Sequence, residues 1–160
     1  MSSGLVYRRG LRGFLKVHET AQHNMLRFVQ DQPGKPEAGG VLLGRHIRDT
    51  ENIVVDSITT PVPEDFASRY RFFRSDKAHQ RLIDDCWEKS RQTCTYLGEW
   101  HTHPESRPTP SFIDLCNWRR KLLFDQFSYC LFFVIVGTQK IHVWEGRSRC
   151  VRLFRLEAHQ

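Results

Sequence analysis

The amino-acid sequence predicts one α/β (α+β) domain that spans residues 1–160, with a mixed sheet of about eight strands flanked by three helices. The length and the 39% hydrophobic content suit a single core, since domains commonly hold roughly 100–150 residues. Apolar runs of strand length alternate along the chain with stretches of helical spacing. No internal repeat, low-complexity tract or long linker interrupts this pattern, so the sequence predicts no second domain.

Three segments have the signals of helices. Residues 18–31 carry apolar side chains at helical spacing and end before Pro33. Ser75 or Asp76 can cap a second helix that continues to about residue 91. A third helix is expected over residues 111–124, because the prolines before it prevent an earlier start.

The strands are predicted from short apolar or alternating runs that are bounded by turn residues. The most apolar of them contains CLFFVIV, which is too short for a membrane-spanning helix of about 20 residues. The eight expected strands cover residues 13–17, 40–44, 52–58, 69–74, 95–101, 129–136, 140–145 and 150–156.

A candidate metal site follows from the segment EWHTHPESRPTPSFID. His101 and His103 are two residues apart on an expected strand, so both imidazoles face the same side and can reach one ion. The prolines that follow turn the chain, and the next helix carries Asp114 in its first turn, where the carboxylate can become a third ligand. Two imidazoles and one carboxylate leave a fourth tetrahedral position open, as in catalytic zinc sites.

The same residues permit a different interpretation. Ser111 and Asp114 have the SxxD spacing of a helix capping box, in which the carboxylate accepts the backbone N–H of Ser111. We expect that one orientation of Asp114 cannot fully serve both the cap and a metal. The hydroxyl of Ser111 is likewise a candidate donor to an oxyanion or a simple cap.

A hydrolase that activates water also needs a carboxylate to accept the proton. Glu37 is the first candidate, because it precedes the apolar strand GGVLLG, whose glycines allow close backbone approach. Glu99 is the alternative acid, since it lies two residues before His101 on the same strand face. It could equally be an acidic partner that orients a ligand histidine.

The spacing HxHx7Sx2D, together with an upstream glutamate on a Gly-rich strand, resembles the JAB1/MPN/Mov34 (JAMM) metallopeptidases, whose fold is similar to that of cytidine deaminases. The resemblance implies one Zn²⁺ per chain held by His101, His103 and Asp114, with Glu37 as general acid and base and Ser111 as oxyanion donor. Glu99 stands where a tryptophan is frequent in this family, so the resemblance assigns it no role.

The segments YLGEWHTHP and EAGGVLLG are most similar to the bacterial JAB deconjugases of CBASS antiphage operons. This likeness implies an isopeptidase whose protein substrate has a flexible C-terminal tail, as in a CD-NTase conjugated to a target through its C-terminus. Two alternatives stay open within the same fold, a non-catalytic MPN scaffold subunit and a RadC-like DNA-associated protein.

The composition indicates which binding partners and which cellular compartment to expect. The 24 Lys and Arg residues, which give a net charge of +6, are scattered along the chain, so we expect an acidic protein partner and no nucleic acid. No apolar leader or membrane span is visible, and the bacterial cytoplasm is expected. Five cysteines without a CxxC pair are expected to be reduced and mostly buried, and no role is assigned to Cys116.

Overall fold

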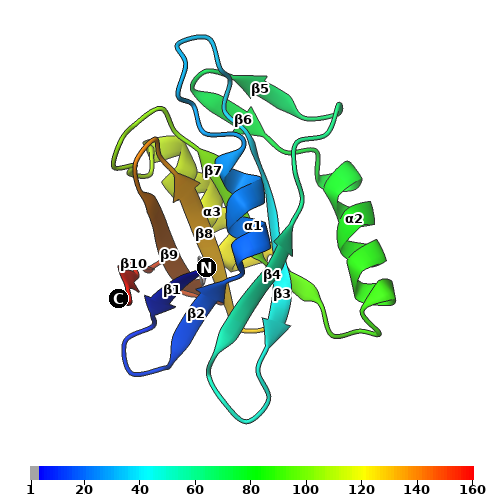
Figure 1. Cartoon of the computed structure of the whole chain (residues 1–160). Helices are drawn as coiled ribbons and strands as arrows, with labels where there is room; N and C mark the ends of the chain where they lie inside the picture. Colours follow the sequence, from blue (N-terminus) through cyan, green and yellow to red (C-terminus); the bar gives the residue numbers. More distant parts are fainter. Residues whose placement is uncertain (1–3) are drawn as a thin grey trace.

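The computed structural model describes residues 4–160 and contains three helices around a strongly curled mixed sheet (Figure 1). The helices are α1 (Glu19–Leu26), α2 (Asp76–Lys89) and α3 (Phe112–Phe124). The strands are β1 (Leu5–Arg8), β2 (Phe14–Val17), β3 (Gly39–His46), β4 (Ile53–Ile58), β5 (Phe66–Ser68), β6 (Arg71–Phe73), β7 (Thr95–Thr102), β8 (Cys130–Val136), β9 (Ile141–Arg147), β10 (Leu153–Arg155) and β11 (Glu157–Ala158).

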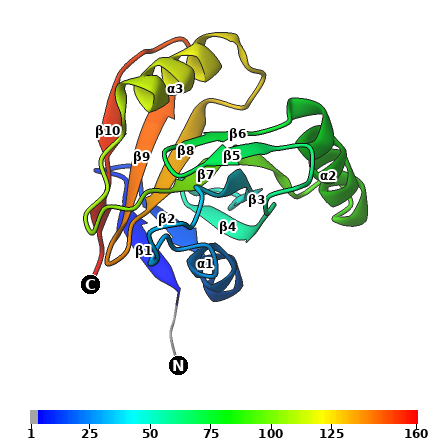
Figure 2. The same cartoon turned by 90° about the horizontal axis from the view of Figure 1, so that it is seen from above.

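The main sheet has nine strands in the order β10-β9-β8-β7-β3-β4-β2-β1-β11, and β5 pairs with β6 in a separate hairpin. The predicted α/β class with three helices is therefore confirmed, with one strand more in the sheet than expected. At the centre, β7 pairs antiparallel with β3 and parallel with β8. Figure 2 shows α1 and α3 on opposite sides of the sheet and α2 beside β3.

The central strand β8 is buried along its whole length, because both of its faces are covered. Phe132 and Val134 belong to the core cluster that includes Ala21 and Met25 of α1. The alternate residues of β8, Leu131, Phe133 and Ile135, pack instead with Trp118 and Leu122 of α3. A strand that faces two helices must be apolar at every position, which explains the CLFFVIV run.

The C-terminal segment closes the sheet. Residues 150–156 are predicted as one strand, but the chain forms β10 on the edge of β9 and then, past Leu156, β11 on the edge of β1. The backbone N–H of Leu156 donates to Val143, at 2.8 Å, within this crossing. One continuous segment, residues 153–158, therefore pairs first with β9 and then with β1. Neither β9 nor β1 is left as an open edge.

Two other expected elements differ from the structure. The helix expected over residues 18–31 ends at Leu26, because the following backbone amides of Phe28 and Val29 bond three residues back and tighten the last turn. The strand expected over residues 69–74 is β6, which pairs with β5 and lies outside the main sheet.

Gly98 allows the bend in β7 that precedes the histidines. Its φ is +137°, and a Cβ atom there would overlap the backbone carbonyl oxygen of Phe132. The ladder to β3 shifts register at this point, between Leu42 and Leu43. A residue without a side chain is therefore required at the irregularity, since only glycine adopts this backbone conformation without strain.

The cysteines depart from the expectation. Cys86 of α2 and Cys94 before β7 form a disulfide, with their Cα atoms 6.1 Å apart, and Cys116 is exposed. The sequence pattern missed the pair because only the packing of α2 against β3 and β7 brings the two residues together. The longest helix of residues 4–160 is α2, with 14 residues, and none of the three helices could span a bilayer.

Candidate metal centre

The ends of β3 and β7 bring three of the predicted site residues together, namely Glu37, His101 and His103. Gly39 pairs with His101 across the antiparallel ladder, and the N–H of Thr102 donates to the carbonyl of Ala38 at 2.8 Å. This register places the segment before β3, which contains Glu37, beside the segment after β7, which contains His103. Residues more than sixty positions apart in the chain therefore meet at one end of the sheet.

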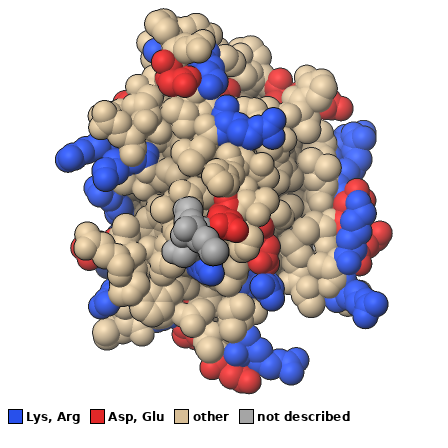
Figure 3. Space-filling view, viewed as in Figure 1, with Lys and Arg blue, Asp and Glu red and all other residues tan. Residues whose placement is uncertain are grey.

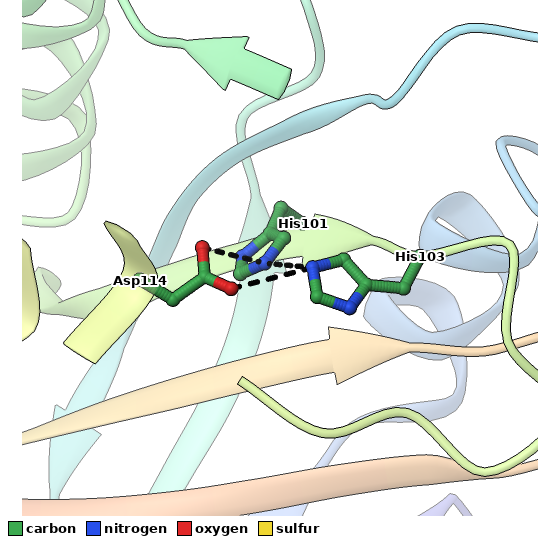
Figure 4. Close-up of side chains that lie close together, drawn as sticks. All are labelled: His101, His103 and Asp114. Atoms are coloured by element: carbon green, nitrogen blue, oxygen red, sulfur yellow. Dashed lines mark hydrogen bonds and ion pairs between the residues drawn. The ribbon is translucent and has the colours of Figure 1, made fainter. Parts of the chain in front are cut away.

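His101, His103 and Asp114 converge on one point (Figure 4). The two Nε2 atoms lie 3.0 Å apart, and the Asp114 oxygens lie 3.3 Å from that of His101 and 3.4 Å from that of His103. Ligands about 2.0–2.1 Å from a tetrahedral zinc are about 3.3 Å from one another. The side chains are 12%, 7% and 17% exposed, so one side of the cluster is open to solvent. The donor set and its spacing therefore fit a single divalent cation.

Asp114 serves the helix cap and the cluster at once. Its Oδ2 accepts the backbone N–H of Ser111 at 2.7 Å, while its own N–H donates to the Ser111 hydroxyl at 3.1 Å. One orientation of the carboxylate thus satisfies the cap and still faces both imidazoles, which was not expected, because Oδ1 faces His101 and Oδ2 has a second lone pair for His103. Burial opposes ionisation, but the hydrogen bonds from both histidines hold the pKa of Asp114 well below its usual range.

Glu37 is buried beside the cluster, with 6% of its surface exposed. Its Oε1 lies 3.8 Å from Nε2 of His103, and its backbone N–H donates to Ser68 at 2.8 Å. Burial raises the pKa of Glu37 to about 7, against the opposing effect of the neighbouring histidines. A carboxyl group with a pKa near neutrality can both accept and release a proton at the working pH.

Glu99, the alternative acid, has other partners. Its Oε1 accepts from Nη2 of Arg74 at 2.6 Å and from Nζ of Lys121 at 3.0 Å. No hydrogen bond joins Glu99 to His101 or His103 within the described part of the chain. Sequence reasoning missed Arg74, because nothing local links the end of β6 to β7.

Glu105 is a second residue that the sequence reasoning missed. Its Oε1 lies 3.5 Å from Nδ1 of His103, the ring nitrogen that points away from Asp114. A carboxylate at this position can fix the tautomer of a ligand histidine. The sequence signal that could have identified Glu105 is its position two residues after His103, in the proline-rich turn.

The cluster opens into a cleft of about 560 Å³. One wall is the hairpin strand β6 with its flanking residues Tyr70 and Arg74, and the opposite wall is the first half of α3, including Ile113 and Asn117. Figure 2 shows this hairpin passing between α3 and α2 above β7. On the face drawn in Figure 3, basic side chains lie in separate groups with acidic ones among them.

The curled sheet, the His–His–Asp cluster and the adjacent buried glutamate define a JAB-type domain. Residues 18–152 match the family of prokaryotic homologs of the JAB domain, and the chain belongs to this family.

Proteins named CD-NTase/cGAS isopeptidase are similar to this chain. One from Vibrio cholerae serotype O1 is 36% identical over 82% of this chain and 81% of its own length. One from a Pseudomonas aeruginosa strain is 32% identical over 82% of each chain, and one from an Escherichia coli strain is 35% identical over 70% of this chain and 67% of its own. The names of these relatives support the assignment of the protein to the hydrolases.

The solution structure of protein DSY2949 from Desulfitobacterium hafniense has the same fold. It superposes with a TM-score of 0.58 at 22% identity and covers 88% of each chain. At this identity the likeness concerns the fold alone.

Proposed function

We propose that the protein is a zinc-dependent isopeptidase that releases a CD-NTase conjugated through its C-terminus to a target, within an antiphage defence system. The observation that carries the proposal is the convergence of His101, His103 and Asp114 beside the buried carboxyl group of Glu37. The names of the relatives support the isopeptidase activity and the class of substrate. The intact ligand set favours an enzyme over a scaffold subunit.

His101, His103 and Asp114 would hold one Zn²⁺ through two imidazole nitrogens and a carboxylate oxygen. When bound, zinc supplies Lewis-acid polarisation of the scissile carbonyl and lowers the pKa of water from 15.7 to about 7. Zinc is the preferred cation because imidazole and carboxylate are its common ligands at catalytic sites.

Glu37 moves the proton in the proposed reaction. Its carboxylate takes a proton from the attacking water as the new C–O bond forms, and it returns the proton to the amine nitrogen as the C–N bond breaks. The raised pKa and the burial of Glu37 support this double role. No covalent enzyme intermediate is required.

Ser111 would stabilise the oxyanion that forms on the scissile carbonyl. Its Oγ accepts the N–H of Asp114, but that contact uses a lone pair and leaves the hydroxyl proton available. The hydroxyl can therefore cap α3 and donate to the substrate together.

The substrate tail would bind as an extended strand. Strand β6 lines the cleft, and within the described residues it pairs only with β5, so it offers a strand edge at the site. A flexible C-terminal tail can add to this edge through backbone hydrogen bonds. Both the conjugate and the enzyme would be located in the bacterial cytoplasm.

The test is cleavage of a CD-NTase fused through its C-terminus to a reporter protein. We expect cutting at the junction, inhibition by a chelator and recovery with Zn²⁺. Glu37→Ala should abolish cutting and retain about one zinc per chain, whereas His101→Ala and Asp114→Ala should lose both. The exposed Glu64→Ala is the matched control and should cut normally.

Other outcomes would contradict the proposal in distinguishable ways. Normal rates in Glu37→Ala would transfer the acid–base role to Glu99. A purified protein that binds no zinc and cuts nothing would be a scaffold. Binding to duplex DNA that weakens steeply with salt would indicate the RadC-like alternative.

A further inference from the structure

A buried amide side chain links three segments around the candidate metal centre. Gln30 is 3% exposed, although it lies in the loop after α1. Its Nε2 donates to the carbonyls of Lys35, at 3.1 Å, and Arg69, at 2.9 Å. Its Oε1 accepts the hydroxyl of Thr102 at 3.1 Å. Figure 1 shows this loop rising beside the β5–β6 hairpin.

Thr102 connects Gln30 to the catalytic end of β3. It is fully buried between His101 and His103, and its Oγ accepts the backbone N–H of Ala38 at 3.0 Å. Because its proton is donated to Gln30, the hydroxyl presents a lone pair to Ala38 in a fixed orientation. The network therefore ends on the peptide unit next to Glu37.

The network matters for catalysis because it fixes the backbone around Glu37. Strand β3 begins at Gly39, so Glu37 and Ala38 lie before the regular ladder to β7. Thr102 extends the ladder through both its backbone and its hydroxyl, and Gln30 holds the loop that leads into Glu37. Neither Gln30 nor Thr102 lines the cleft, so neither can contact the substrate.

We propose that Gln30 and Thr102 are positioning residues that set the carboxyl group of Glu37 relative to His101 and His103. This inference rests on the proposed acid–base function of Glu37. A small displacement of a proton-transferring group lowers the rate of the chemical step without weakening substrate binding. The expected signature is therefore a fall in kcat at constant KM.

Thr59 provides a matched control. It is buried like Thr102, and its Oγ accepts the backbone N–H of Val41 at 2.9 Å and lies 2.7 Å from Nδ1 of His79. This hydroxyl makes the same kind of bond to β3, but three residues further along the strand from Ala38. Thr59→Val should cost stability as Thr102→Val does and leave the catalytic geometry in place.

The experiment compares Thr102→Val, Gln30→Met and Thr59→Val with the zinc-loaded wild type on the CD-NTase fusion. We expect the first two to lower kcat by about tenfold or more with KM and zinc content unchanged. Thr102→Ser should restore the rate, and the Gln30→Met/Thr102→Val double variant should lose little more than Thr102→Val. Thr59→Val should keep a wild-type kcat.

Amide hydrogen exchange gives a second readout that does not depend on activity. The Ala38 amide should exchange faster in Thr102→Val, and the Val41 amide faster in Thr59→Val. If Thr102→Val does not fold, Gln30→Met tests the inference alone, because it changes no residue of β7.

Equal kcat values for Gln30→Met and Thr59→Val would overturn the inference, as would loss of zinc from Gln30→Met. A wild type that cuts nothing would instead overturn the proposed function, and the inference with it. The two failures are thus separated by the wild-type rate.

Discussion

At the scale of single residues, one carboxylate belongs both to a helix cap and to the candidate metal cluster. Asp114 accepts the N–H of Ser111 and faces both imidazoles because its two oxygens point in different directions. Capping thereby orients the candidate ligand, which costs less conformational entropy than fixing a free side chain. The start of α3 therefore contributes a helix cap and a candidate metal ligand through the same side chain.

The two roles of Ser111 can be separated by substitution. Glycine at an N-cap costs only a few tenths of a kcal/mol, whereas alanine costs about 1 kcal/mol. Ser111→Gly should therefore melt near the wild-type temperature and lose about 10²- to 10³-fold in kcat, as expected for an oxyanion donor. The measurements are thermal unfolding and turnover of the fusion substrate.

Ser75→Gly is the control for Ser111→Gly, because Ser75 caps α2 in the same way, with its side chain accepting from Ala78. It should change neither the melting temperature nor kcat appreciably. A Ser111→Gly variant that turns over at the wild-type rate would restrict Ser111 to the helix cap.

At the scale of elements, the buried carboxylate of Asp65 fixes the start of α2. Asp65 accepts the backbone N–H groups of Ser75, at 2.7 Å, and Val62, at 2.8 Å, and its Oδ2 lies 3.0 Å from Nε2 of His79. Burial opposes ionisation, but the bond from His79 and the two amides lower the pKa of Asp65 below its ordinary value.

The lowered pKa of Asp65 predicts how stability depends on pH. A depressed carboxyl pKa contributes stability above the unfolded pKa of about 3.9, and this contribution is lost as the pH falls through the folded pKa. Asp65→Asn should therefore unfold at lower urea concentration than the wild type at pH 7. The difference between the two unfolding midpoints should begin to narrow below about pH 4, where the unfolded wild-type chain takes up a proton, and it should disappear once the pH has fallen through the lowered pKa of the folded state.

Asp84→Asn is the control for Asp65→Asn, since Asp84 is exposed on α2. Its urea unfolding midpoint should equal that of the wild type both at pH 7 and below pH 4. A gap for Asp65→Asn that is the same at pH 7 and at acidic pH would show that ionisation of Asp65 contributes nothing.

At the scale of the whole molecule, a buried ion pair joins the two ends of the closed sheet. Arg9, which follows β1, donates from Nη2 to Glu145 of β9 at 2.8 Å, and the two side chains are 0% and 6% exposed. Arg9 also donates to the carbonyl of Glu51. Removing one partner would leave the other charge buried without compensation.

The effects of substituting Arg9 and Glu145 on the free energy of unfolding should not be additive. Glu145→Ala should lower the free energy of unfolding by about 3–5 kcal/mol, because it leaves the Arg9 guanidinium unpaired. The double variant Arg9→Met/Glu145→Leu should lose less, since it buries no charge. Urea unfolding measures both, and a double variant less stable than Glu145→Ala would contradict the argument.

The exposed pair Arg45–Asp56 is the control for this prediction. Its side chains are 53% and 35% exposed, so Asp56→Ala should cost no more than about 1 kcal/mol.

Local patterns in the sequence were sufficient for much of the fold and for three members of the site. The two-residue period of β7 placed His101 and His103 on one face, and the proline-rich turn with its cap placed Asp114 at the start of α3. The apolar run of β8 indicated a strand buried on both faces. These signals lie within a few residues, where backbone geometry alone relates one side chain to the next.

Only the tertiary structure decided the remaining features. The approach of Glu37 to His103, the engagement of Glu99 by Arg74, and the closure of the sheet by β10 and β11 all depend on pairings between distant segments. The burial that raises the pKa of Glu37 exists only once those segments have packed. Periodicity and capping report which face a residue occupies and where an element begins, but they carry no information about which strand lies alongside.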